Sequence, residues 1–193
     1  MNLRNIAALA VILPGSVFAE SDESQSGGIT KALEMPAHRA LITRIGQGDT
    51  TLAPFQTDGC SGGLSDVWRL VSSQLPDFAE AHEEAPPWES CCVTHDRAYH
   101  GITGAETAAA SYNARLQADA ELRSCVMETG ESRKDSVAVH YDVEVETVEE
   151  AYEIIAQSMY LAVRFGGGPC SGLPWRWGYG WPDCSILRLG GAE

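Results

Sequence analysis

Two adjacent cysteines, Cys91 and Cys92, constrain the fold of this chain more than any other feature. They fall within residues 88–100, which follow two prolines and contain no helix breaker, so this segment is predicted to be a helix. Neighbouring side chains on a helix point about 100° apart, so the two cysteines must bridge to different elements. Two other parts of the chain are therefore expected to be linked to this one helix.

A secretory signal is predicted over residues 1–19. Arg4 precedes an apolar run over residues 6–13, and small residues follow where signal peptidase needs them, with cleavage expected after Ala19. A buried N-terminal helix is the alternative, but Pro14 and Gly15 interrupt the run. The run is too short to span a bilayer, and no other segment is long and apolar enough. We therefore expect a secreted or periplasmic protein with no transmembrane segment in its mature form.

An even number of cysteines in an exported chain predicts three disulfides. A zinc site is the alternative, but it would require paired Cys-x-x-Cys or Cys-x-x-His spacings, which the sequence lacks. The six cysteines are Cys60, Cys91, Cys92, Cys125, Cys170 and Cys184.

The chain carries 27 acidic and 13 basic residues and a formal net charge of -14. This balance argues against nucleic acid as a partner and against membrane binding through basic patches. Acidic runs at 80–84 and 144–153 are expected to be solvated faces rather than calcium sites. The length suits one domain at residues 51–193, preceded by a loosely ordered polar arm at residues 20–50, and we expect a monomer.

Three helices are predicted, so the fold class is mostly α. The first, at residues 88–100, ends at Gly101 and Gly104, and a second runs over residues 105–127 and stops near Gly130. The short connection makes this pair antiparallel. A third helix at about residues 147–164 carries one apolar stripe that is expected to be core: Val148, Ala151, Tyr152, Ile155, Met159 and Val163.

The tail at residues 166–184 is loop-like and holds a dense aromatic cluster. One interpretation is an interfacial patch, because Trp and Tyr favour the headgroup region of bilayers. The other is a small core folded around a cysteine bridge. The sequence leaves both open for Trp175, Trp177, Tyr179 and Trp181.

His95, Asp96 and Asp119 are candidates for chemistry. His95 and Tyr99 share one face of the first helix, whereas Asp96 is rotated by about 100° toward another neighbour. Asp119 interrupts the inward apolar stripe of the second helix, formed with Tyr112, Leu116, Leu122 and Val126. A buried carboxylate needs a hydrogen-bond donor, and antiparallel packing offers His95.

A Gly-rich segment at residues 57–65 is predicted to be either a binding loop or a simple turn. Calcium takes carboxylate and carbonyl oxygens, and such a loop supplies carbonyls without steric hindrance. Asp96 together with this loop is therefore a candidate calcium site.

The segment Cys91-Cys92-Val93-Thr94-His95-Asp96-Arg97-Ala98-Tyr99 resembles the Cys-Cys-x-x-His-Asp-x-Cys-Tyr active-site helix of secretory phospholipases A2. The loop over residues 58–62 is most similar to the calcium loop of the group XII branch. Asp119 lies six residues before Cys125, which is also the family spacing. The resemblance covers residues 55–126 and extends weakly to Cys184.

This resemblance implies a function, a metal and a set of bridges. His95 would be the general base, Asp119 would orient it and Tyr99 would hydrogen-bond that carboxylate. Calcium would bind Asp96 and carbonyls near Gly59, Ser61 and Gly63, and the substrate would be the sn-2 ester of a phospholipid at a membrane surface. The implied disulfides are Cys60–Cys92, Cys91–Cys125 and Cys170–Cys184.

The sequence also departs from the family pattern. Ala98 and Ala118 replace both cysteines of one family bridge, Ser61 stands where glycine is common, and the insertion at residues 64–90 is long. A non-catalytic calcium- and lipid-binding or protein-docking module on the same fold is the alternative function. A purely structural exported domain would leave Asp119 on an apolar stripe unexplained.

Overall fold

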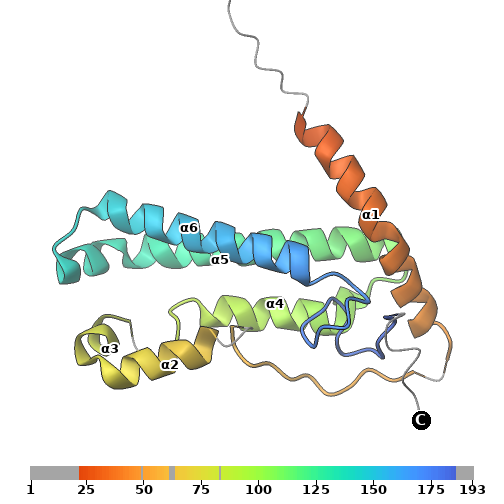
Figure 1. The fold of residues 1–193 in the computed structure, drawn as a ribbon, viewed down its shortest axis with the longest axis horizontal. Helices are drawn as coiled ribbons and strands as arrows, with labels where there is room; N and C mark the ends of the chain where they lie inside the picture. The colour runs from red at the N-terminus through yellow and green to blue at the C-terminus, as the bar shows by residue number, and fades with distance from the viewer. Residues whose placement is uncertain (1–21, 49, 61–63, 83, 186–193) are drawn as a thin grey trace, which may run out of the picture.

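The computed structural model describes residues 22–48, 50–60, 64–82 and 84–185, so the predicted signal at 1–19 lies outside the described residues. Within these ranges the chain is mostly helical and contains no strand (Figure 1). This confirms the mostly α class. The elements are α1 (Asp22–Ile45), α2 (Leu64–Gln74), α3 (Pro76–His82), α4 (Glu89–Gly101), the short 3-10 helix η1 (Ile102–Gly104), α5 (Ala108–Tyr141) and α6 (Val145–Gly166).

Helices α4 and α5 form the predicted antiparallel pair. Residue numbers rise along α4 and fall along α5 from one contact to the next. Cys91 is bonded to Cys125, and His95 is hydrogen-bonded to Asp119. The turn between them uses left-handed backbone at Ile102 (φ 53°) and Gly104 (φ 73°). Thr107 then caps α5, its hydroxyl accepting a hydrogen bond from the Ala110 amide at 3.1 Å.

The sequence predicts that the second helix ends near Gly130. In the structure α5 continues to Tyr141, so this prediction was wrong. Gly130 lies inside the helix because α6 packs tightly against it: a Cβ atom there would lie 2.4 Å from the Tyr152 ring. The glycine thus permits close packing of α5 on α6 rather than breaking the helix. The third helix is confirmed, with Val148, Tyr152 and Ala156 buried against α5, whereas Ala151 is exposed.

The segment predicted to be a loosely ordered polar arm is instead largely helix α1, so this expectation was wrong. Leu41 and His38 are both completely buried. The helix packs on α5, where His38 Nδ1 lies 2.8 Å from the Ser111 hydroxyl. The prediction assumed that the polar residues of this segment are solvated. Some of them are instead buried and have partners on other elements.

The long insertion between the Gly-rich loop and α4 forms α2 and α3. Trp68 of α2 anchors them, with its ring centroid 4.8 Å from Phe78 and 5.3 Å from Trp88. Glu80 and Glu84 are exposed, as expected for a solvated acidic run. The second acidic run is exposed as well, at Glu144, Glu146, Glu149, Glu150 and Glu153.

The C-terminal tail folds back beside the end of α4, where Figure 1 shows it close to α1. Trp177 is completely buried in a core cluster with Leu41, Tyr99, Ile102 and Ala118. This position favours the small-core interpretation for Trp177, while Trp175, Tyr179 and Trp181 keep partial exposure.

Three disulfides join these elements. They are Cys60–Cys92, Cys91–Cys125 and Cys170–Cys184, the same pairs that the resemblance implied. As expected, the adjacent cysteines of α4 bridge to two different elements. No helix in the described ranges has both the length and the apolar character needed to cross a membrane.

Candidate active site

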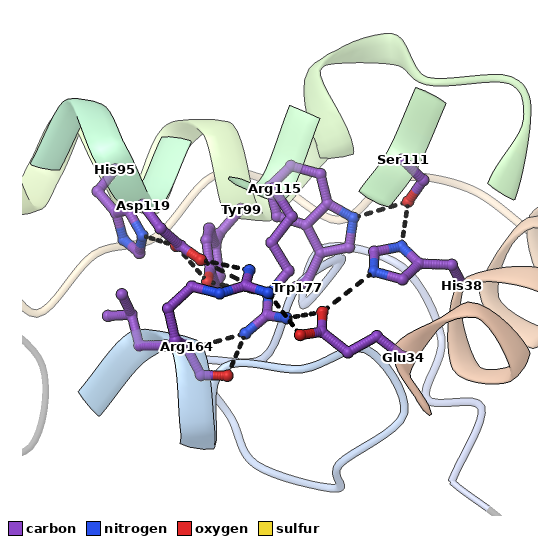
Figure 2. A network of polar contacts seen from close by, with 10 residues as sticks. Glu34, His38, His95, Tyr99, Ser111, Arg115, Asp119, Arg164 and Trp177 are labelled. Carbon is purple, nitrogen blue, oxygen red and sulfur yellow. Dashed lines mark hydrogen bonds and ion pairs between the residues drawn. The ribbon is translucent and has the colours of Figure 1, made fainter. Parts of the chain in front are cut away.

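His95, Tyr99 and Asp119 meet at the interface of α4 and α5 (Figure 2). His95 Nε2 lies 2.9 Å from Asp119 Oδ1, and the Tyr99 hydroxyl donates to the same oxygen at 2.6 Å. All three are buried, and Asp119 is not exposed at all. The four-residue spacing of His95 and Tyr99 places both on the α4 face that contacts α5.

Asp119 remains a carboxylate in spite of its burial. Burial alone would raise its pKa, but the hydrogen bond to His95, the charge of Arg115 and the hydrogen bonds from Tyr99 and Arg164 together lower it. An ionised Asp119 favours the tautomer that carries its proton on His95 Nε2. Nδ1 is then the nitrogen that can accept a proton.

Tyr99 serves as a neutral donor in this arrangement. Burial and the neighbouring Asp119 charge raise its pKa well above the usual value, so its hydroxyl keeps its proton at neutral pH. Gly167 allows the ring this position, because a Cβ atom there would lie 2.8 Å from the Tyr99 ring.

Two arginines complete the surroundings of Asp119, and sequence reasoning missed both. Arg164 of α6 donates to Asp119 Oδ2 at 2.9 Å, and Arg115 Nε lies 3.9 Å from the same oxygen. Arg115 is completely buried, whereas Leu116, which was expected to face inward, is 38% exposed. A signal was present, since Arg115 precedes Asp119 by one helical turn and so shares its face.

Glu34 of α1 links the two arginines from the far side (Figure 2). Its carboxylate is hydrogen-bonded to Arg115 Nη1 and accepts from Arg164 Nη2 at 2.5 Å. Arg115 Nη2 also donates to the carbonyls of Val163 and Arg164 at 2.8 Å each. The buried charges are thus paired, which a low-dielectric interior requires. No feature of the sequence around Glu34 pointed to this role.

Asp96 lies apart from this network, as its position on the helix predicted. Its Oδ2 accepts a hydrogen bond from the Thr57 hydroxyl at 2.6 Å, and the residue as a whole is only 8% exposed. Burial raises its pKa, and the nearby Asp58 charge acts in the same direction, against the effects of Thr57 and His95. Within the described ranges Asp96 makes no ion pair, so a bound cation would relieve its desolvation.

The Gly-rich loop lies against the start of α4. Gly59 has φ 78°, and a Cβ atom on it would lie 2.5 Å from Glu89 Oε1, so only glycine suits this position. The Cys60–Cys92 disulfide holds the loop beside Asp96. Ser61 and Gly63, the other expected calcium ligands, lie outside the described residues.

The described residues contain no cluster of three or more His, Cys, Asp or Glu side chains that could hold a metal. Any calcium ion at Asp96 would therefore depend on backbone carbonyls, which calcium accepts readily. The buried Asp96 carboxylate has no ion pair and lies beside the loop that contains Gly59, so it fits such a site.

Two cavities share Asp96. The smaller, about 100 Å³, is bounded by His95 and the Cys60–Cys92 bridge and is otherwise apolar, with Leu122, Met159, Ala162 and Val163 in its wall. The larger, about 260 Å³, lies on the side of Thr57 and the C-terminal loop. Its wall is formed by Gln56, Thr57, Asp58, Asp96, Pro174, Trp175 and Tyr179.

Comparison with known proteins gives no further guide: no family model, curated protein or solved structure matches this chain.

Proposed function

We propose that this protein hydrolyses the sn-2 acyl ester of phospholipids in a calcium-dependent reaction, releasing a fatty acid and a lysophospholipid. The observation that carries the proposal is that the neighbouring residues His95 and Asp96 contact different partners. His95 is oriented by Asp119 and Tyr99, while Asp96 turns away toward Thr57 and the loop. A purely structural helix would not require this arrangement.

In the proposed reaction His95 acts as the general base. Nδ1 takes a proton from a water molecule as the water oxygen attacks the ester carbonyl, and a tetrahedral intermediate forms. The imidazolium then returns the proton to the departing glycerol oxygen when the carbon–oxygen bond breaks. Asp119 stabilises the cation and holds the ring orientation, as in other histidine–carboxylate pairs. No serine nucleophile is needed.

Calcium would be held by Asp96 and by loop carbonyls near Gly59, with Ser61 and Gly63 as the further ligands that the resemblance implies. The bound ion would supply electrostatic stabilisation of the developing oxyanion and a partner for the lipid phosphate. The apolar cavity beside His95 has the character needed to accept an acyl chain, because Leu122, Met159 and Val163 offer no hydrogen bonds.

Fatty acid release from mixed phospholipid vesicles, measured with calcium and with a chelator, tests the proposal directly. We expect release only with calcium, and in the wild type but not in His95→Gln. Vesicle binding without release in any condition would contradict the proposal and would favour the non-catalytic lipid-binding module.

A further inference from the structure

The larger cavity beside Asp96 has two aromatic rings and two carboxylates in its wall. Trp175 and Tyr179 come from the C-terminal loop, and Asp58 and Asp96 come from the Gly-rich loop and α4. No lysine or arginine lines it within the described residues. At about 260 Å³ it has room for a group much larger than a water molecule, which occupies about 30 Å³ in the liquid.

Both rings are held in place by their surroundings. A Cβ atom on Gly166, at the end of α6, would lie 2.3 Å from the Trp175 ring, so the indole rests directly on that backbone. The Tyr179 hydroxyl donates to the Gln56 carbonyl at 2.7 Å, and its ring meets His100 edge-on at 5.2 Å. A site whose walls are fixed before binding loses little entropy when a ligand enters.

We propose that this cavity binds a quaternary ammonium group, and hence that the enzyme prefers lipids with a choline head group. A trimethylammonium ion cannot donate a conventional hydrogen bond, and it is attracted to aromatic faces and to carboxylates. The wall contains two aromatic rings, and it contains the Asp58 carboxylate in addition to Asp96, the residue that the proposed function assigns to calcium. The lipid part of the proposal rests on the proposed function, whereas ammonium binding does not.

The electrostatic environment is consistent with a cation here. Burial raises the pKa of Tyr179, and the charges of Asp96 and Asp58 raise it further. Arg97 acts in the opposite direction, but its guanidinium lies 4.4 Å from the Phe55 ring centroid and is not part of the wall. An anionic head group would instead meet the negative charge of Asp58.

The position of the cavity also suits a head group. Asp96 borders both cavities, so a lipid with its ester beside His95 and its phosphate near Asp96 would direct its alcohol substituent toward Trp175 and Tyr179. The site would thus recognise the head group, which the glycerol backbone and the phosphate separate from the ester being hydrolysed.

Choline binding to the full chain without calcium tests the first step. Choline chloride should shift the indole N–H resonance of Trp175, assigned from Trp175→Phe, in a saturable way. Dimethylbutanol, the uncharged carbon isostere of choline, should not. Trp175→Leu should weaken choline binding roughly threefold to thirtyfold, the range expected for one cation–π contact. Leu173→Ala, in the same loop but outside the wall, should bind as the wild type does. Equal responses to choline and its isostere would overturn the proposal.

Hydrolysis separates this inference from the proposed function. Hydrolysis is measured with calcium on vesicles of phosphatidylcholine and on vesicles of phosphatidylglycerol. Trp175→Leu should lower the ratio of the rate on phosphatidylcholine to the rate on phosphatidylglycerol, and Leu173→Ala should leave this ratio unchanged. An equal loss on both lipids would make Trp175 a general membrane anchor and would contradict the head-group preference. If neither lipid is hydrolysed, the proposed function is refuted. The choline titration would still decide whether the cavity binds an ammonium group.

Discussion

At the scale of single residues, the candidate site depends on how Asp119 is kept charged without exposure to water. His95, Tyr99 and Arg164 donate to its two oxygens, and Arg115 adds a nearby positive charge. Removing one partner from such a group leaves a buried charge uncompensated, which is far more costly than removing a surface pair.

His95→Gln is expected to reduce lipid hydrolysis by at least ~10²–10⁴-fold, the range attributed to general-base catalysis, because glutamine cannot accept the proton. Calcium binding should be retained, since the imidazole is not a proposed ligand. Initial rates of fatty acid release give the measurement. His140→Gln, which alters an exposed histidine on α5, is the control and should leave the rate unchanged. Full activity in His95→Gln would show that another group is the base.

Asp96→Asn is expected to abolish the stabilisation that calcium confers on the folded chain. The ion would lose its only charged ligand among the described residues, and binding to the folded state is what raises the unfolding temperature. Thermal unfolding with calcium and with chelator provides the measurement, and Asp77→Asn, at an exposed site on α3, is the matched control. Equal calcium-dependent shifts in wild type and Asp96→Asn would remove Asp96 from the metal site.

At the scale of elements, α1 contributes to the site through charge. Glu34 bridges the arginines of α5 and α6, so the helix that precedes the hairpin in sequence closes the network on its far side. Burial would raise the pKa of Glu34, but the His38 ring, whose Nε2 lies 3.8 Å from the carboxylate, and the charges of Arg115 and Arg164 lower it overall. The ionised form therefore stabilises the folded chain.

Glu34→Gln should lower the free energy of unfolding at pH 7 by about 1–3 kcal/mol, the cost of losing hydrogen bonds to charged groups. Because the folded pKa of Glu34 is lowered, its contribution is fully present above the unfolded value near 4.5 and is lost as the pH falls through the folded value. Urea unfolding of wild type and variant from pH 7 to pH 3 should show the difference shrinking. Glu106→Gln, an exposed change, should show little difference at any pH. A difference that stays constant with pH would contradict the ionised bridge.

The contact between α5 and α6 gives a prediction of unusual sign. Alanine normally stabilises a helix by about 1 kcal/mol relative to glycine, yet Gly130→Ala should destabilise this protein by about 1–3 kcal/mol. The added methyl would lie 2.4 Å from the Tyr152 ring, so α6 would have to move. Chemical denaturation measures the change, with Gly168→Ala as a control, because a Cβ atom at Gly168 has no neighbour within 4 Å. A more stable Gly130→Ala protein would mean that the helices can separate easily.

At the scale of the whole molecule, three disulfides connect residues that are 32, 34 and 14 positions apart in the sequence. Two of them attach the Gly-rich loop and α5 to the same turn of α4, and the third closes the C-terminal loop that carries Trp175 and Trp177. Each disulfide reduces the number of conformations open to the unfolded chain, and each keeps elements of the site near one another.

Partial reduction followed by alkylation and peptide mapping should recover Cys60–Cys92, Cys91–Cys125 and Cys170–Cys184 as the only native pairs. Stepwise reduction is needed because Cys91 and Cys92 are adjacent and remain in one peptide. A bridge between Cys91 and Cys170 would contradict the α4–α5 pairing and the position of the site that depends on it.

Local patterns in the sequence determined much of the hairpin. The adjacent cysteines required two partners for one helix, Gly101 and Gly104 marked its end, and the helical spacing placed His95 and Tyr99 on one face with Asp96 on another. Such signals lie within a few residues of one another, so they can be read without knowledge of the fold. They sufficed to predict that His95 and Asp119 would meet.

Only the tertiary structure decided the rest. Glu34 is separated from Arg115 by 81 residues and from Arg164 by 130, and the composition of α1 alone predicts a polar arm. The same composition can describe a solvated segment or a helix whose charges are buried. The difference lies in whether distant partners compensate the loss of hydration. The role of Gly130 also depends on a distant partner. A glycine would weaken an isolated helix, but here it permits contact with Tyr152 of another helix.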